Sequence, residues 1–260
     1  MNANWKQLWT LAQLLLLLLS YIEPAPILEE EYLEELENLF DEANAENENN
    51  NRNAVKNPQK LWPSTTLRYR IADDYAPTEA ENVRKALDFF NEHTCLNFEQ
   101  HNDLVDADQR FIFFKKSEKM CGTLVGYNRH TPTGPHDVLL NPYCLTRPGV
   151  VQHETLHVLG LYHEQSRPDR NDYVSIDFTN IPLRFWTQFT AQSDSQVTTY
   201  DVPYDYESIM HYSKNAFARD PSKPTIRAKE GDLIVERNMG QVEAPSEGDL
   251  IKIRRMYNCD

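Results

Sequence analysis

One stretch of twelve residues, 153–164, constrains the fold of this chain more than any other, and it reads His153-Glu154-Thr155-Leu156-His157-Val158-Leu159-Gly160-Leu161-Tyr162-His163-Glu164. In a helix, His153 and His157 lie one turn apart on the same face, so both imidazoles can reach one metal ion. Gly160 follows, and glycine enters the left-handed backbone region without steric cost. We therefore expect the helix to end there and the chain to turn so that His163 becomes a third ligand.

Three imidazoles and a carboxylate at this spacing are what a hydrolytic zinc ion requires. Glu154 is placed beside the fourth coordination position, where it can take a proton from the attacking water. The alternative is a set of ordinary helix residues. With 8 His and 8 Gly in 260 residues, a chance match at these positions has an expectation of roughly 10⁻⁵ per chain. The sequence therefore predicts one catalytic Zn²⁺ ion per chain and a zinc protease.

The first 22 residues have the pattern of a secretory signal peptide. A single cation, Lys6, precedes an apolar run that ends in the leucine block 14–19, which is too short to span a bilayer comfortably. The alternative is an uncleaved amphipathic anchor. We expect the protein to be secreted and extracellular, without stable membrane association.

Residues 23–52 form an acidic segment. Residues 1–52 contain eleven acidic and two basic residues, and so carry nine of the fourteen net negative charges of the chain. Such a composition has little to bury and folds poorly alone. It is either a solvated tail or a pro-segment whose carboxylates occupy the active site until it is removed. Arg52, just before Asn53, is where we expect an activating trypsin-like protease to cut.

The remaining residues, 53–260, suffice for one domain or for a two-lobed one. The motif helix is apolar nearly all round and should be buried. A Ser-x-x-Asp signal at Ser246 predicts the start of a last helix, and prolines make the part between the two irregular. The other elements that we expect are strands near residues 67–71, 110–115 and 137–141, an amphipathic helix after Pro77, and a short helix over 183–189. This mixture predicts an α+β fold.

The cysteines are four in number and follow a signal peptide, which favours two disulfides over thiol chemistry or metal binding. They are Cys95, Cys121, Cys144 and Cys259, and the sequence allows three pairings. No basic stripe and no aromatic–basic pattern is present, so we expect no nucleic-acid partner.

The motif residues 153–164, together with Ser166-Arg167-Pro168-Asp169-Arg170 and Ser208-Ile209-Met210-His211-Tyr212, resemble the astacin family of metzincin zinc endopeptidases. The resemblance runs from about Trp62 to Cys259. It implies a two-lobed metzincin-like protease domain over residues 53–260. Its N-terminal lobe would hold a twisted sheet and two long helices, and its irregular C-terminal lobe would end in a helix.

The resemblance also implies roles for single residues. His153, His157 and His163 would hold the catalytic zinc, and Glu154 would act as general base and then as general acid. Tyr212 would be a further zinc ligand that swings away to stabilise the oxyanion. Two other implied roles concern Met210, as the apolar floor beneath the metal, and Glu164, which would meet the new N-terminus at Asn53 in the mature enzyme. The implied disulfides are Cys95–Cys259 and Cys121–Cys144.

Three functions are compatible with the zinc motif, and two of them compete directly. The third, another zinc hydrolase such as an amidase, would explain neither the methionine turn at residues 208–212 nor the zymogen-like acidic segment. The first is a secreted, monomeric endopeptidase that is made as a zymogen and cleaves internal bonds of protein or peptide substrates. The second is a catalytically silent extracellular zinc-fold binding protein. A silent relative is expected to lose the base or a ligand, whereas Glu154 and all three histidines are present. The sequence therefore favours the enzyme.

Overall fold

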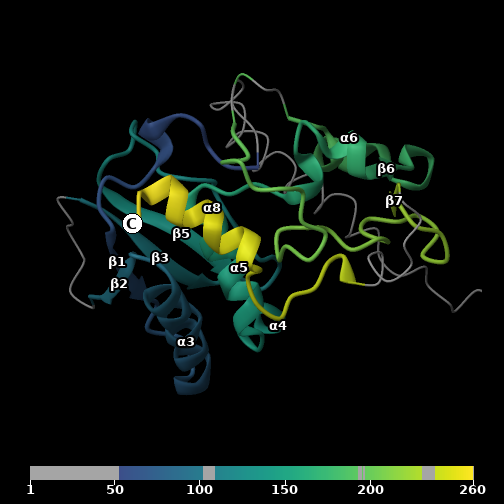
Figure 1. Cartoon of the computed structure of the whole chain (residues 1–260). Coiled ribbons are helices and arrows are strands. Elements are labelled where there is room, and N and C mark those ends of the chain that lie inside the picture. Colours follow the sequence, from purple (N-terminus) through teal and green to yellow (C-terminus); the bar gives the residue numbers. More distant parts are fainter. Residues whose placement is uncertain (1–52, 102–108, 193–194, 196, 230–237, 260) are drawn as a thin grey trace, which may run out of the picture. The chain divides into compact units, whose positions relative to one another are not determined.

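The computed structural model of the chain (Figure 1) describes residues 53–101, 109–192, 195, 197–229 and 238–259. The predicted signal peptide, the acidic segment and Arg52 lie outside the described residues. None of the helices in the described part combines the length and the apolarity that a membrane span requires.

A five-stranded sheet forms the centre of the N-terminal lobe, in the order β2-β1-β3-β5-β4. Its strands are β1 (Thr66–Ile71), β2 (Asn97–Gln100), β3 (Arg110–Lys116), β4 (Gly122–Thr123) and β5 (Gly134–Leu140). All pairs are parallel except the edge pair of β4 with β5. Along β1, Leu67, Tyr69 and Ile71 are buried, while the alternate residues Thr66 and Arg68 are exposed. This alternation places one face of the strand in the core.

Two long helices pack against each other in the N-terminal lobe. In α3 (Pro77–His93) the buried residues recur at helical spacing, from Ala80 and Val83 to Phe90. The motif helix, α5 (Pro148–Leu159), is buried over most of its length. A short helix, α4 (Pro142–Leu145), precedes it. The predicted sheet and both long helices are thus confirmed.

The C-terminal lobe is largely irregular and has a smaller core of its own. That core contains Val174, Ile181, Phe189, Tyr204, Ile226 and Met239. Its regular elements are short: η2 (Glu164–Ser166), α6 (Arg170–Tyr173), β6 (Val174–Ile176), η3 (Phe178–Asn180), η4 (Leu183–Phe189) and β7 (Ile226–Ala228). The short helix expected over 183–189 is present as the 3-10 helix η4. The two cores confirm the two-lobed α+β fold.

The last helix, α8 (Glu247–Tyr257), begins at the predicted cap. The hydroxyl of Ser246 accepts a hydrogen bond from the Asp249 N–H at 3.1 Å, and the Asp249 carboxylate accepts one from the Ser246 N–H at 3.0 Å. The inner face of α8, with Ile253 and Met256, belongs to the core of the N-terminal lobe. Each such side chain contributes about 1.5–3 kcal/mol when fully buried. The helix that ends the C-terminal lobe therefore stabilises the other lobe.

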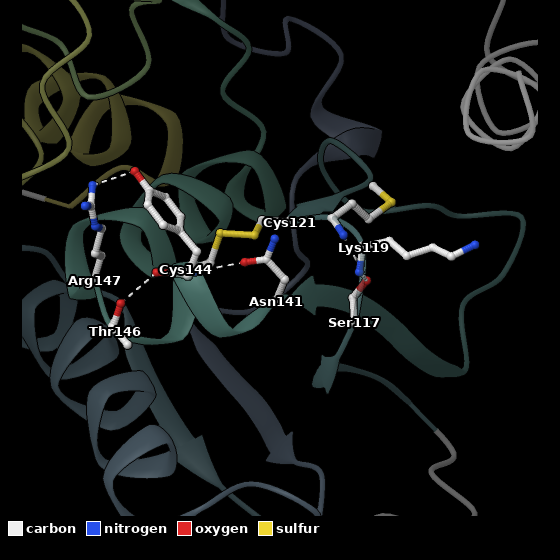
Figure 2. The surroundings of a disulfide bond; sticks show 9 residues. Ser117, Lys119, Cys121, Asn141, Cys144, Thr146 and Arg147 are labelled. Atoms are coloured by element: carbon white, nitrogen blue, oxygen red, sulfur yellow. Dashed lines mark hydrogen bonds between the residues drawn. A yellow bond between two sulfur atoms is a disulfide. The ribbon is translucent and has the colours of Figure 1, made fainter. Parts of the chain in front are cut away.

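Both disulfides form the pairs that the family resemblance implies. Cys95–Cys259 joins the residues after α3 to the end of α8, with a Cα–Cα distance of 5.1 Å. Cys121–Cys144 joins the residue before β4 to α4, with a Cα–Cα distance of 6.5 Å (Figure 2). Beside it, the Asn141 side chain caps α4 by accepting a hydrogen bond from the Cys144 N–H at 3.1 Å. Cross-links of this kind stabilise a fold by about 2–4 kcal/mol each.

Candidate active site

The motif helix ends where the sequence predicts. Gly160 has a φ of 110°, and its N–H donates to the His157 carbonyl oxygen at 2.9 Å. A Cβ at this position would lie 2.8 Å from a methyl carbon of Val55. Both the backbone conformation and the close packing therefore require glycine here. After this turn the chain brings His163 back to the helix.

The three histidines converge. Their ligand atoms all lie within 4.8 Å of one another. The ring centroid of His157 is 4.7 Å from that of His153 and 4.7 Å from that of His163. Three imidazoles at this separation match the protein ligands of a catalytic zinc site, which leaves a fourth position open.

Hydrogen bonds orient two of these rings. Nδ1 of His153 donates to the Ile209 carbonyl oxygen at 2.8 Å, and Nδ1 of His157 donates to the Leu161 carbonyl oxygen at 2.7 Å. The lone pair of each Nε2 is thereby left for a metal. Burial lowers the pKa of His153, and burial together with His153 lowers the pKa of His157 to about 3. Both rings are therefore held in the neutral form that binds metal, and the donor set fits zinc.

Glu154 is buried on the same helix. Among the described residues, none bonds its Oε2 atom. Burial raises the pKa of its carboxyl group to about 8. A carboxylate with a raised pKa is a stronger proton acceptor than an exposed one. Glu154 therefore has the environment of a base and lacks the partners of a structural carboxylate.

Residues 208–212 contact the motif region, beginning with the bond from His153 to the Ile209 carbonyl oxygen. Met210 is fully buried, and its carbonyl oxygen accepts a hydrogen bond from the Glu164 N–H at 2.9 Å. The Tyr212 ring lies 4.4 Å from the ring of His163, centroid to centroid. Burial, and secondly the charge of Glu154, raises the pKa of Tyr212 above its ordinary value. Tyr212 is therefore a neutral phenol beside the histidine cluster.

Asp249 supports the site from α8, although the sequence indicated only a helix cap. Its carboxylate is fully buried and accepts hydrogen bonds from the Ser208 hydroxyl at 2.6 Å and from the Ile209 N–H at 3.0 Å. The carbonyl of Ile209 orients His153. One buried carboxylate thus connects the last helix to the peptide that holds the first histidine.

Glu164 lies at the centre of a buried charge cluster. One carboxylate oxygen accepts hydrogen bonds from Arg167 at 2.9 Å and from the Asp205 N–H at 3.1 Å, and the other binds Lys252 at 2.5 Å. Burial alone would raise the pKa of Glu164, but Lys252 and Arg167 lower it below its ordinary value. The sequence had indicated neither of these partners.

Asn53 is buried near this cluster. Its side-chain amide donates to the Tyr162 carbonyl oxygen at 2.9 Å, and its own carbonyl oxygen accepts from the Tyr162 N–H at 2.6 Å. Tyr162 is two residues from Glu164 in the sequence. The predicted contact between the α-amino group of Asn53 and Glu164 stays a prediction, because that amino group is free only in a cleaved chain.

Solved structures with the same fold include a zinc protease. The structure is similar to that of high choriolytic enzyme 1, a hatching enzyme zinc-protease from Oryzias latipes (medaka fish). The TM-score is 0.71, and 28% of residues are identical over 80% of this chain and 100% of that one. Myroilysin shares the fold alone, with a TM-score of 0.55 and 16% identity over 80% of this chain and 98% of its own. The fold and the histidine cluster together place this chain in the class of zinc metalloproteases.

Comparison of the sequence with known families identifies the family within this class. The family model Astacin (Peptidase family M12A) matches residues 54–258, and the chain belongs to this family. It is 37% identical to zinc metalloproteinase nas-28 of Caenorhabditis elegans over 80% of this chain and 40% of the relative. It is 33% identical to meprin A subunit alpha of Mus musculus over 80% of this chain and 26% of the relative. The chain thus matches less than half the length of these relatives.

Proposed function

We propose that this chain is a secreted zinc-dependent endopeptidase that hydrolyses internal peptide bonds of protein or peptide substrates. The observation that carries the proposal is the convergence of three imidazoles within 4.8 Å, beside the buried carboxylate of Glu154. Burial lowers the pKa of all three, including that of His163, so all three are neutral. His153, His157 and His163 would hold one zinc ion per chain. Tyr212 would be a further ligand in the resting site, and Met210 packs beneath the site. The enzyme acts as a monomer.

The metal, Glu154 and Tyr212 each have a separate role in peptide hydrolysis. Bound zinc supplies Lewis-acid chemistry, acidifying the attacking water and polarising the scissile carbonyl. Glu154 accepts the proton of that water as it attacks and then delivers it to the leaving amine. The Tyr212 hydroxyl donates a hydrogen bond to the oxygen on which negative charge develops, which lowers the barrier because this interaction is strongest in the transition state.

The same proposal includes a latent precursor. Residues 1–22 are a signal peptide, residues 23–52 are an acidic pro-segment, and 53–260 are the protease domain. A trypsin-like protease cuts after Arg52 and frees the α-amino group of Asn53, which then approaches Glu164. That ammonium joins a cluster in which Lys252 and Arg167 already bind the carboxylate. The new N-terminus therefore adds to an existing charge network.

The silent binding protein is the competing function. It would keep the fold, but nothing would select for a buried carboxylate with an unsatisfied oxygen beside three converging imidazoles. Burying such a group without hydrogen-bond partners costs free energy, and this cost is expected to persist only where the group has a catalytic role. The environment of Glu154 therefore favours the enzyme.

One experiment tests both the activity and the latency. The secreted precursor and its Arg52→Gln variant are treated with trypsin, their N-termini are sequenced, and the bonds they cleave in a denatured protein are mapped by mass spectrometry. We expect a mature chain that begins at Asn53 and cuts internal bonds, whereas Arg52→Gln stays uncleaved at this position and has low activity. A mature chain that cuts no internal bond would support the silent protein. Full activity of uncleaved Arg52→Gln would refute latency alone.

A further inference from the structure

Two glutamines hold Tyr212 from different segments. The Tyr212 N–H donates to Oε1 of Gln165, in η2, at 3.1 Å. The Tyr212 hydroxyl donates to Oε1 of Gln188, in η4, at 3.2 Å. The first contact fixes the backbone of this residue, and the second fixes the direction of its hydroxyl hydrogen.

Arg170 ties these two segments together. Its Nη1 atom donates to the Gln165 carbonyl oxygen at 3.1 Å and to the Phe189 carbonyl oxygen at 2.6 Å. Arg170 is buried, and Phe189 is anchored in the core of the C-terminal lobe. Because Phe189 directly follows Gln188, the backbone that carries the Gln188 amide is held in place.

Aromatic neighbours restrict the Tyr212 ring. Its centroid lies 5.7 Å from that of Phe189 and 5.5 Å from that of Phe217. His163 lies on another side, so three aromatic rings flank that of Tyr212. The hydrogen on the phenol oxygen keeps its freedom to rotate, and the Gln188 side chain is placed to control it.

We infer that Gln188 is a positioning residue for Tyr212 that holds the phenol oxygen both before and during the reaction. A primary amide carries an acceptor oxygen and two N–H donors on the same carbon. In the resting site its oxygen accepts the Tyr212 hydroxyl, as the structure shows. When that hydroxyl turns to the substrate oxyanion, rotation of the amide allows an N–H to donate to the phenol oxygen. This second bond polarises the hydroxyl and strengthens its donation.

This inference rests on the proposed function and deepens it, since it names what guides the oxyanion donor. It predicts different effects for two replacements. Gln188→Met can neither accept nor donate, and we expect kcat to fall about threefold to tenfold, the value of one hydrogen bond, with KM little changed. Gln188→Glu can only accept, and it binds the hydroxyl more strongly as a carboxylate. We therefore expect Gln188→Glu to lower kcat at least as much as Gln188→Met.

A double-mutant cycle separates this role from a structural one. Each Gln188 variant is made in the wild-type chain and in Tyr212→Phe, and kcat, KM and the dissociation constant of a phosphinic peptide, an oxyanion mimic, are measured. Thr187→Val, an exposed position on the same segment whose side chain makes no hydrogen bond to Tyr212, is the matched control. We expect the Gln188→Met effects on kcat and on phosphinic-peptide binding to disappear in Tyr212→Phe.

Two outcomes would overturn the inference: wild-type kcat in Gln188→Glu, or equal Gln188→Met effects with and without the Tyr212 hydroxyl. A loss of folding is detected by the thermal unfolding of each variant, and Gln188→Asn, which keeps the amide on a shorter side chain, then replaces Gln188→Met in the cycle. A wild-type mature protein without peptidase activity would overturn the proposed function instead. Calorimetry of phosphinic-peptide binding distinguishes a failure of the inference about Gln188 from a failure of the proposed function.

Discussion

Replacing Glu154 by Gln is expected to lower kcat by on the order of 10²–10⁴-fold while metal content and thermal stability stay nearly unchanged. The amide has the same shape as the carboxylate but cannot accept the proton of the attacking water. Little structure depends on the charge, because none of the described residues bonds Oε2 of Glu154.

Peptidase assays, zinc analysis and thermal unfolding of the purified variant check this expectation. Glu118→Gln, an exposed carboxylate distant in sequence from the motif, is the control and should behave as wild type. A wild-type turnover rate in Glu154→Gln would show that another group is the base. A variant that loses both activity and zinc would instead indicate that Glu154 holds the site together.

Replacing Lys252 by Met is expected to destabilise the protein by about 3–5 kcal/mol, because it leaves Glu164 buried with one cation fewer. Both side chains of the pair are fully buried. Urea unfolding followed by fluorescence measures the change in the free energy of unfolding. By contrast, Lys223 pairs with Asp220 at the surface. Replacing Lys223 by Met should lower the free energy of unfolding by less than about 1 kcal/mol.

The double variant Glu164→Gln with Lys252→Met tests whether the buried charge of Glu164 causes this loss of stability. Removing both charges leaves no carboxylate at position 164, so the part of the lost stability that Glu164 causes should return. The buried carboxylate of Asp249 loses the charge of Lys252 in the single and in the double variant alike. Arg167 keeps its second partner, Asp169, at 2.7 Å in that variant. Equal destabilisation in the single and double variants would contradict this explanation and would assign the loss to packing of the lysine side chain.

The sequence predicts the elements whose signals are local. The histidine spacing, the glycine stop and the Ser246 cap of α8 each depend on residues within one or two turns. The strands β1, β3 and β5 have six or seven residues and a clear apolar pattern. By contrast β2, β4, β6 and β7 have two to four residues and pair with distant segments, so no local pattern reveals them.

The same distinction applies to the site. The histidines and Glu154 lie on or just after one helix, and their spacing alone brings them together. Lys252 is 88 residues from Glu164, and Asp249 is 40 residues from Ile209. Such partners are single residues without a spacing rule, and only the folded chain shows which of them meet. Gln188 belongs to this group, since no pattern in its segment points to Tyr212.

Zinc content and its link to activity test the central claim most directly. Metal analysis of the mature enzyme should give one zinc ion per chain, a chelator should remove the ion together with peptidase activity, and added zinc should restore both. Calorimetry with and without the ion should also show that zinc raises the thermal stability. Full peptidase activity in a folded preparation without bound zinc would contradict the account.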